Sequence, residues 1–504
     1  MTSLVFLTNK DSGVVYVYLN EKIFDEKQGR HVYRRRCVGH VDPKSGKILP
    51  NRTKRKNHSM SVESVGVDML FSGIASEIGL MHALQIAFSK SWRLILSCAM
   101  YCATEKGPLS DLPLWSSKNT TPFGSTILMK DLEELISTME TRSIDSFLKI
   151  WYRKVGDTDA VMLPIKCVDN GLRRPSETKF GIKLSNDSFA SDYGVCFGKN
   201  TGLPLGFVYY ATPPDSLSDI FSGHLRFSWL DMESYTFLIP PYVLTDNNLH
   251  ELASPKWNYI AEIPNSLKFA KDAVKEHHHN VFSSHIQDTT GMSDRVYTTI
   301  DMEMDGERIH QHLYYDAVLE ETESSAFMNL IDKCAKELES GNIVVPHNPI
   351  YHQYFVVKSD DNGNAFIDLN PEEIMRSMEG SGFKIILSDA VTDPMEASRW
   401  SDIRNDTALF YDNLRNTADN SNLKLYLAPN GVKRDFIQFV ALILRAALMQ
   451  RMISTGLSRS YSIKEVLNEM SSICLIRSDN RKNAVLSELN DDQRIMFDVL
   501  GITV

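Results

Sequence analysis

The sequence has few of the features that would assign a protein class directly. Its 504 residues include seven cysteines, an odd number without paired spacing, which argues against a disulfide framework and favours reduced thiols in a cytoplasm. The opening MTSLVFLTNKDSG reaches an acidic residue too early for a secretory signal. The strongest apolar run, Phe436–Met449, contains Gln438 and Arg445 and is too short to span a bilayer. We therefore expect no membrane association.

Acidic residues outnumber basic ones, 64 Asp and Glu against 54 Lys and Arg, and the basic residues are densest in one segment. The chain carries a net charge of −10, yet the segment from Lys27 to Asn57 contains eleven Lys or Arg and a single acid, Asp42. Such asymmetry is typical of a localised contact with a polyanion such as DNA. A solvated basic hairpin without a ligand is the alternative interpretation.

The N-terminal third is predicted to contain a strand-rich part and a helical part. Segments 3–9, 14–20 and 32–41 are β-branched and aromatic and are separated by polar turns, which predicts a small β-rich module over residues 1–60. Apolar residues then recur every three or four positions, which predicts a helical region over residues 61–155. We expect this region to serve in DNA binding or dimerisation.

The rest of the chain is predicted to be an α/β domain over residues 156–460, with an insertion at about 280–380 and a helical appendix over 461–504. Strand patterns begin near its start, and long helices are expected around 396–416 and 434–453. Strands that are interrupted by an insertion and completed by a C-terminal helix suit an RNase H-like domain with a mixed sheet.

The most specific pattern lies within the first of these long helices. Residues Ser401–Arg415 read SDIRNDTALFYDNLR. This segment resembles the catalytic helix of insertion-sequence DDE transposases, whose signature is Tyr, two residues, Arg, three residues, Glu, six residues, Lys. On that spacing the four signature positions fall on Ser401, Arg404, Ala408 and Arg415. Both basic positions are kept, whereas the metal-binding Glu is replaced by Ala408.

The resemblance extends over almost the whole chain. The opening VYVYLNEKIFDEKQGRHVYRRRCVGHVDPKSGKILP is similar to the N-terminal module of the family. The hairpin GVCFGKNTGLPLGFVYYATPPDSLSD is similar to its strand pair, and RDFIQFVALILRAAL to the apolar helix after the catalytic one. The order and spacing of these pieces together identify the chain as a relative of this family.

The family's chemistry requires three carboxylates that hold two divalent ions, because hard cations such as Mg²⁺ take oxygen ligands. The first carboxylate belongs to the first strand of the domain, which here reads VMLPIKC and places Pro164 at that position. The second falls on Pro240 in FLIPPYVLTDNNL, and the third on Ala408. The resemblance therefore implies that no metal site and no cofactor remain. A proline in this strand also predicts a bulge or shifted pairing near Pro164.

The candidate DNA contacts come from the basic segment and from the two basic positions kept in the signature. They are Arg34, Arg35, Arg36, Arg52, Lys54, Arg55, Lys56, Arg404 and Arg415.

The sequence thus predicts an inactive or domesticated transposase that binds DNA at the nucleoid of a prokaryotic cytoplasm, with a homodimer as the candidate assembly. The first alternative is an active transposase in which displaced carboxylates among Asp169, Asp231 and Glu233 bind Mg²⁺ or Mn²⁺. The second is a non-catalytic protein scaffold on the same fold, since the acidic remainder of the chain would repel phosphate.

Overall fold

The computed structural model describes most of the chain: residues 2–10, 12–25, 30–50, 60–104, 107, 109–165, 192–210, 216–253, 258–283, 296–359, 365–416, 431–478 and 484–502. The chain divides into two compact units. One comprises Met1–Ser61 with Ile476–Val485, and the other comprises Val62–Leu475 with Leu486–Val504.

The first unit is built on an antiparallel sheet in which the strands follow chain order. Its strands are β1 (Thr2–Thr8), β2 (Val15–Asp25), β3 (Arg30–Val41) and β4 (Ile48–Pro50). The three predicted strands are confirmed, and β4 is added by the turn that Asp42 organises. The main-chain oxygen of Asp42 accepts from the N–H of Gly46, whose φ of +66° suits glycine. Of the described residues in this sheet, Val17 is the fully buried apolar one.

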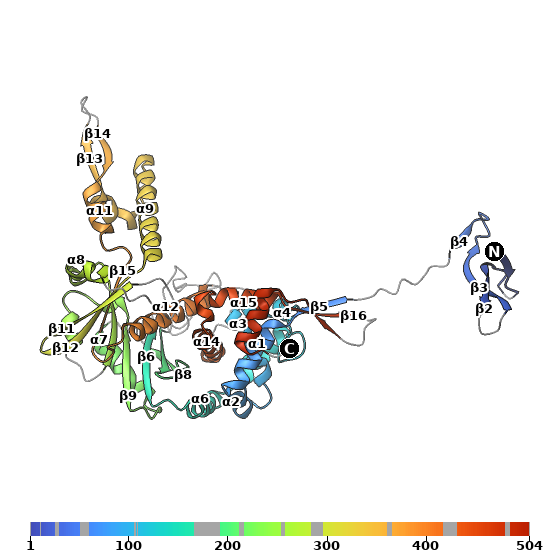
Figure 1. Cartoon of the computed structure of the whole chain (residues 1–504), viewed down its shortest axis with the longest axis horizontal. Helices are drawn as coiled ribbons and strands as arrows, with labels where there is room; N and C mark the ends of the chain where they lie inside the picture. The colour runs from blue at the N-terminus through green and yellow to red at the C-terminus, as the bar shows by residue number, and fades with distance from the viewer. Residues whose placement is uncertain are drawn as a thin grey trace, which may run out of the picture. The chain divides into compact units, whose positions relative to one another are not determined.

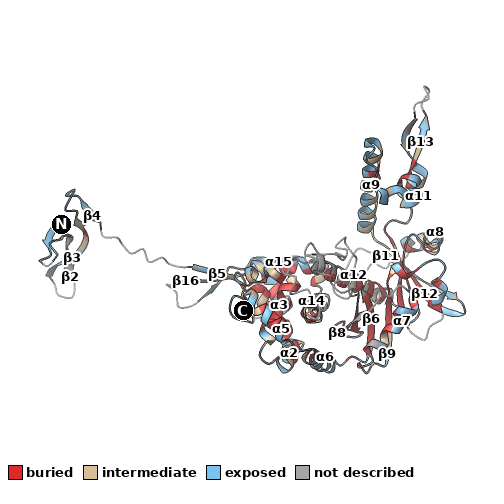
Figure 2. Cartoon of the chain, turned by 180° about the vertical axis from the view of Figure 1, so that it is seen from behind, coloured by how far each residue is buried: buried red, intermediate tan, exposed pale blue. Residues whose placement is uncertain are grey.

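The second unit opens with the predicted helices. They are α1 (Gly66–Glu77), α2 (Leu80–Ala87), α3 (Trp92–Thr104), α4 (Leu112–Ser116), α5 (Met129–Thr138) and α6 (Thr141–Val155), with the 3₁₀ turn η1 (Leu109–Asp111) before α4. Ten consecutive residues of α3, from Leu94 to Ala103, are buried. This helix therefore forms the centre of the helical region rather than a surface layer (Figure 2).

An eight-stranded mixed sheet follows, which confirms an α/β fold. The strand order is β11-β12-β15-β10-β9-β6-β7-β8. Strand β6 is parallel to β9 and β9 to β10, whereas the other neighbours are antiparallel. The bounds are β6 (Asp159–Ile165), β7 (Asp192–Gly198), β8 (Pro204–Tyr210), β9 (Ser234–Ile239), β10 (Asn258–Ile263), β11 (Val296–Met304), β12 (Glu307–Tyr315) and β15 (Phe383–Ser388).

The sheet is apolar on both faces because a helical layer covers each. On one face Val161 and Leu163 join the core formed with α3, α12 (Pro394–Asn416) and α14 (Gly431–Ser454). On the other face Ala160 and Met162 join the core formed with α7 (Leu217–Ser222) and α8 (Lys268–Ser283). The remaining 3₁₀ segments connect these elements: η2 (Gly223–Phe227), η3 (Pro241–Val243), η4 (Leu249–Ala253) and η7 (Leu457–Arg459).

The predicted bulge at Pro164 is wrong. The β6–β7 register runs without a shift from Ala160 opposite Gly198 to Ile165 opposite Tyr193. The Asp159 carbonyl accepts from the N–H of Lys199 at the end of β7, so the even-numbered residues of β6 direct their backbone groups toward β9. The ladder with β9 ends at Met162. The missing N–H of Pro164 therefore costs no hydrogen bond between strands, because β9 no longer pairs with β6 at this position.

The insertion contributes to the main sheet and also forms a small body of its own. Strands β11 and β12 extend the sheet, and the body follows them (Figure 1). It contains α9 (Ala317–Ser340), η5 (Val345–His347), α10 (Asn348–Tyr354), β13 (Phe355–Ser359), β14 (Ala365–Leu369) and α11 (Pro371–Met378).

Two predictions for the C-terminal part require correction. Helix α14 is longer than the apolar run in the sequence, and Val432–Ser454 is long and apolar enough to cross a membrane by length and composition. In this structure, however, 67% of its most apolar window is buried inside the protein. The expected helical appendix contains strands as well, because α15 (Ile463–Ser472) and α16 (Asp491–Leu500) are separated by β16 (Cys474–Ser478) and β17 (Val485–Leu486). Strand β5 (Met60–Ser64) precedes α1.

Candidate functional site

We call Pro164, Pro240 and Ala408, which the sequence resemblance aligns with the three carboxylates of the family, the triad positions. The first two lie at the edge of the large sheet that is formed by the carboxyl ends of β6 and β9. Strands β6 and β9 run parallel with Met162 opposite Phe237, which brings Pro164 level with Ile239. Pro240 directly follows Ile239, and both prolines are buried. Because the carboxyl ends of parallel strands meet at the same edge, Pro164 and Pro240 lie at the same edge of the sheet.

The third position lies on the helix that contacts this edge. Ser401, Arg404 and Ala408 recur at intervals of three and four residues and therefore share one face of α12. Arg404 directs its Nη1 toward the main-chain oxygen of Ile239, 3.5 Å away. Ala408 is one turn further along and packs against the main apolar core.

The described residues of β6 and β9 include no carboxylate at the carboxyl ends of these strands. Asp159 is the one acidic residue of β6, it lies at the strand's amino end, and it accepts a hydrogen bond from Ser234. Leu163 faces the α12 side of the sheet, so strand alternation directs Pro164 to the other face. If the alignment with the family were shifted by one residue, Leu163 or Ile165 would occupy the first carboxylate position instead of Pro164. Neither side chain can bind a metal ion.

Two of the three displaced carboxylates proposed from the sequence do not reach this edge. Asp231 and Glu233 are exposed and precede β9, so the length of the strand, roughly 20 Å for six residues, separates them from Pro240. Asp169 lies outside the described residues.

A charged cluster that the sequence did not reveal lies at this edge instead. Glu262 stands on β10 level with Pro240, because Ala261 pairs with Ile239. Its Oε2 accepts from Nη2 of Arg404 at 2.8 Å and from the hydroxyl of Ser401. Nζ of Lys384, at the start of β15, lies 3.4 Å from the same oxygen.

Lys384 also connects Glu262 to the helix. Its Nζ lies 3.6 Å from Oδ1 of Asp402, so the ammonium group lies within ion-pairing reach of two carboxylates. Burial acts to raise the pKa of Glu262, but Lys384 and Arg404 outweigh it and hold that pKa below its ordinary value. Glu262 is therefore ionised, and its charge is balanced by side chains of the protein.

The cluster forms part of the wall of a cavity of about 270 Å³. Acidic and basic groups both line it, among them Glu262, Asp316, Glu323, Lys384 and Asp402. A pair of Mg²⁺ ions needs several free carboxylate oxygens. The described residues at this edge do not fit such a pair, because Arg404 and Lys384 already pair with Glu262 and Lys384 also lies near Asp402.

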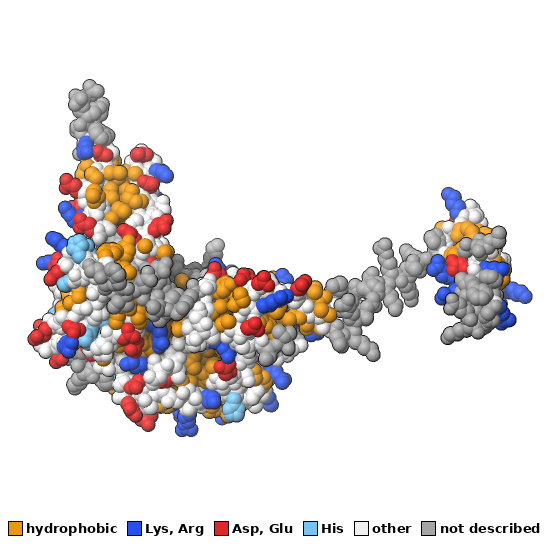
Figure 3. Space-filling model, in the orientation of Figure 1, with side chains coloured by type: hydrophobic (Ala, Val, Ile, Leu, Met, Phe, Trp, Pro, Cys, Tyr) orange, Lys and Arg blue, Asp and Glu red, His pale blue; other side chains and the backbone are white. Residues whose placement is uncertain are grey.

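The predicted DNA contacts fall into three groups. Arg34, Arg35 and Arg36 are exposed on β3. The register pairs Arg34 with Glu21, Arg35 with Asn20 and Arg36 with Leu19, so Arg34 and Arg36 share one face of the sheet and Arg35 lies on the other. On the face seen in Figure 3, Lys and Arg side chains lie at several points of this module, beside apolar and acidic ones.

The other predicted contacts are buried or undescribed. Arg404 is 8% exposed and is paired with Glu262, which contradicts its prediction as a phosphate contact in this conformation. The side chain of Arg415 lies outside the described residues. The same holds for four residues of the basic segment, Arg52, Lys54, Arg55 and Lys56.

Comparison with known proteins gives little more. No family model matches the chain. No curated protein matches it. Among solved structures, a synaptic complex of the piggyBac transposase with hairpin DNA is similar over 85% of this chain and 86% of that chain, with 9% sequence identity and a TM-score of 0.26. A similarity at this level carries no argument about function.

Proposed function

We propose that this chain is a transposase-related DNA-binding protein whose RNase H-like domain has lost its catalytic metal site. The observation that carries the proposal is the edge where β6, β9 and α12 meet. Pro164 and Pro240 lie at the carboxyl ends of these strands, α12 carries Ala408, and Glu262 is paired with Arg404 and Lys384.

The strand arrangement supports the RNase H-like part of the proposal. Strands β6, β7 and β8 are consecutive antiparallel neighbours, and β9 and β10 continue on the other side of β6 in parallel. An RNase H-like sheet has this order, with its first strand at the centre. The helix that bears the signature, α12, contacts β9 and β10 in this sheet.

A cleavage assay tests the loss of chemistry. Supercoiled plasmid and family-like terminal repeats are incubated with the full chain and either Mg²⁺ or Mn²⁺. We expect no strand cleavage or transfer, because the described edge offers no free carboxylate set. Metal-dependent cleavage that Asp231→Ala or Asp169→Ala abolishes would establish displaced carboxylates and overturn the proposal.

A salt titration tests the DNA-binding part. Each phosphate contact adds roughly −0.9 to the slope of log affinity against log salt on duplex DNA. If Arg34 and Arg36 contact phosphates from their shared face, the variant with both changed to Ala reduces the magnitude of that slope by about 1.8. Arg35→Ala should reduce the magnitude of the slope by about 0.9 or less, because the Arg35 side chain lies on the opposite face of the sheet.

A matched control removes the same charge elsewhere. Lys271 and Lys275 are exposed on α8, and changing both to Ala should leave the slope unaltered. Equal slopes for the Arg34/Arg36 variant and the native chain would show that the basic strand is only a solvated surface. Absence of any DNA binding would favour the scaffold alternative.

A further inference from the structure

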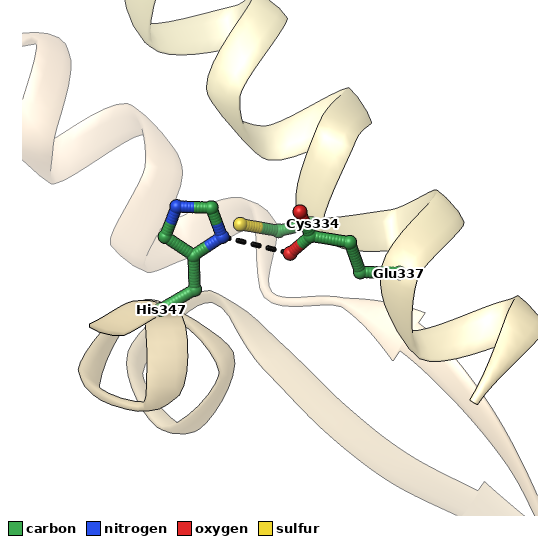
Figure 4. Close-up of side chains that lie close together, drawn as sticks. All are labelled: Cys334, Glu337 and His347. Carbon is green, nitrogen blue, oxygen red and sulfur yellow. Dashed lines mark hydrogen bonds and ion pairs between the residues drawn. The ribbon is translucent and has the colours of Figure 1, made fainter. Parts of the chain in front are cut away.

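Three potential metal ligands converge inside the small body of the insertion. Cys334 and Glu337 lie one turn apart on α9, and His347 ends η5 (Figure 4). Their ligand atoms all lie within 4.8 Å of one another. Cys334 is fully buried, while the side chains of Glu337 and His347 are 12% and 17% exposed. This group is independent of the triad edge and of the basic strand.

The present contacts already orient the ligands. Nδ1 of His347 lies 2.7 Å from Oε2 of Glu337, and the hydroxyl of Tyr351 donates to that same oxygen at 2.5 Å. The hydroxyl of Tyr351 in turn accepts from the N–H of Val344 at 3.1 Å. Zinc bonds of about 2.0–2.3 Å would require the His347–Glu337 contact to open by roughly half an ångström around a tetrahedral ion.

The ligand types select the metal. Thiolate and imidazole favour Zn²⁺ over Mg²⁺ or Ca²⁺, and one carboxylate completes a three-ligand set with a fourth position left for water. We propose that Cys334, Glu337 and His347 bind one Zn²⁺ ion that fastens η5 and α10 to α9.

A zinc ion held by three protein ligands would add a constraint to this small body. Its separate core contains five buried residues, Ile331, Cys334, Tyr351, Phe355 and Ile374. Apolar cores of this size contribute little stability, and small folds often add a metal ion for that reason. The cluster joins two elements of this body, α9 and η5, so an ion at this point restrains the chain from residue 341 to residue 347.

Protonation makes the binding dependent on pH. A thiol that coordinates a metal ion is deprotonated. Metal uptake therefore releases a proton, and affinity should fall as the solution becomes more acidic.

Cobalt titration of the metal-depleted full chain tests the site. Bound Co²⁺ should give visible d–d bands and a near-ultraviolet thiolate-to-cobalt charge-transfer band at one equivalent, and Zn²⁺ should displace both. Cys334→Ser should abolish the charge-transfer band. Glu337→Gln keeps the size of the side chain and should weaken binding at least tenfold. Tyr351→Phe, which removes a hydrogen bond to a ligand, should weaken it by about 10–100-fold.

The controls test whether thiols and imidazoles outside the cluster bind cobalt. Cys474→Ser and His352→Ala alter residues outside the cluster and should leave the cobalt spectrum unchanged. Circular dichroism checks that each variant is folded, and hydrogen exchange should show that Zn²⁺ protects residues 341–354 in the native chain. A spectrum without a thiolate band, or a band that persists in a folded Cys334→Ser chain, would overturn the proposal.

Discussion

Replacing Arg404 distinguishes a DNA contact from an internal ion pair. Breaking a buried ion pair by removing one partner usually costs about 3–5 kcal/mol. Here Lys384 still lies 3.4 Å from the same carboxylate, and the side chain of Glu262 is 22% exposed. We therefore expect Arg404→Met to lower the free energy of unfolding by about 2 kcal/mol. Urea unfolding followed by tryptophan fluorescence suits the measurement, because Trp400 is buried on the same helix.

A double-mutant cycle gives the interaction itself. Glu262→Gln removes the charge that Arg404 balances, so the variant with both changes should be more stable than the sum of the two single losses predicts, by about 1–2 kcal/mol. DNA affinity should be the same for the native chain and for Arg404→Met. Strictly additive losses, or weaker DNA binding with unchanged stability, would refute the assignment of Arg404 to an internal pair.

Three further predictions concern protonation and the β7–β8 turn. The folded-state pKa of Glu262 lies below its ordinary value of 4.5. The ionised side chain therefore contributes fully to the free energy of unfolding above about pH 4.5, and this contribution is lost as the pH falls through the folded-state pKa. Glu262→Gln should remove that part of the acid dependence of stability in urea titrations. Burial lowers the pKa of His312 to about 4, so the folded state disfavours its protonation and stability should fall by up to roughly 3 kcal/mol as the pH drops from 6.5 to 4, a loss absent from His312→Gln. Asp157 is buried and accepts from the N–H groups of Asn200 and Thr201, so Asp157→Ala should cost about 2 kcal/mol in thermal or urea unfolding, whereas an unchanged midpoint would contradict this role.

Local patterns were sufficient to predict the elements but not their contacts. The alternation in VYVYL and the apolar spacing of α14 predict a strand and a helix because each pattern is set by neighbours in the sequence. The bulge at Pro164 was wrongly predicted because the sequence does not reveal where the ladder with β9 ends. The strands β16 and β17 were missed in a segment that opens with a strongly helical pattern.

The candidate site was predictable only where a signature supplied the spacing. The positions of Pro240 and Ala408 followed from the resemblance, and the structure places the first at the sheet edge and the second on the helix beside it. Glu262 and Lys384 belong to no motif, since they are separated by more than a hundred residues and meet only because β10 and β15 pair. The same holds for His347, which reaches Cys334 through a turn that no spacing rule describes.

The ion pairs of Lys384 have a consequence for how this edge depends on its surroundings. Carboxylates gathered around divalent ions repel one another once a chelator removes those ions, so such an edge changes with metal supply. Lys384 is a cation attached to the chain, and it lies between Glu262 and Asp402 whatever the solution contains. The edge should therefore keep one conformation in EDTA and in millimolar Mg²⁺.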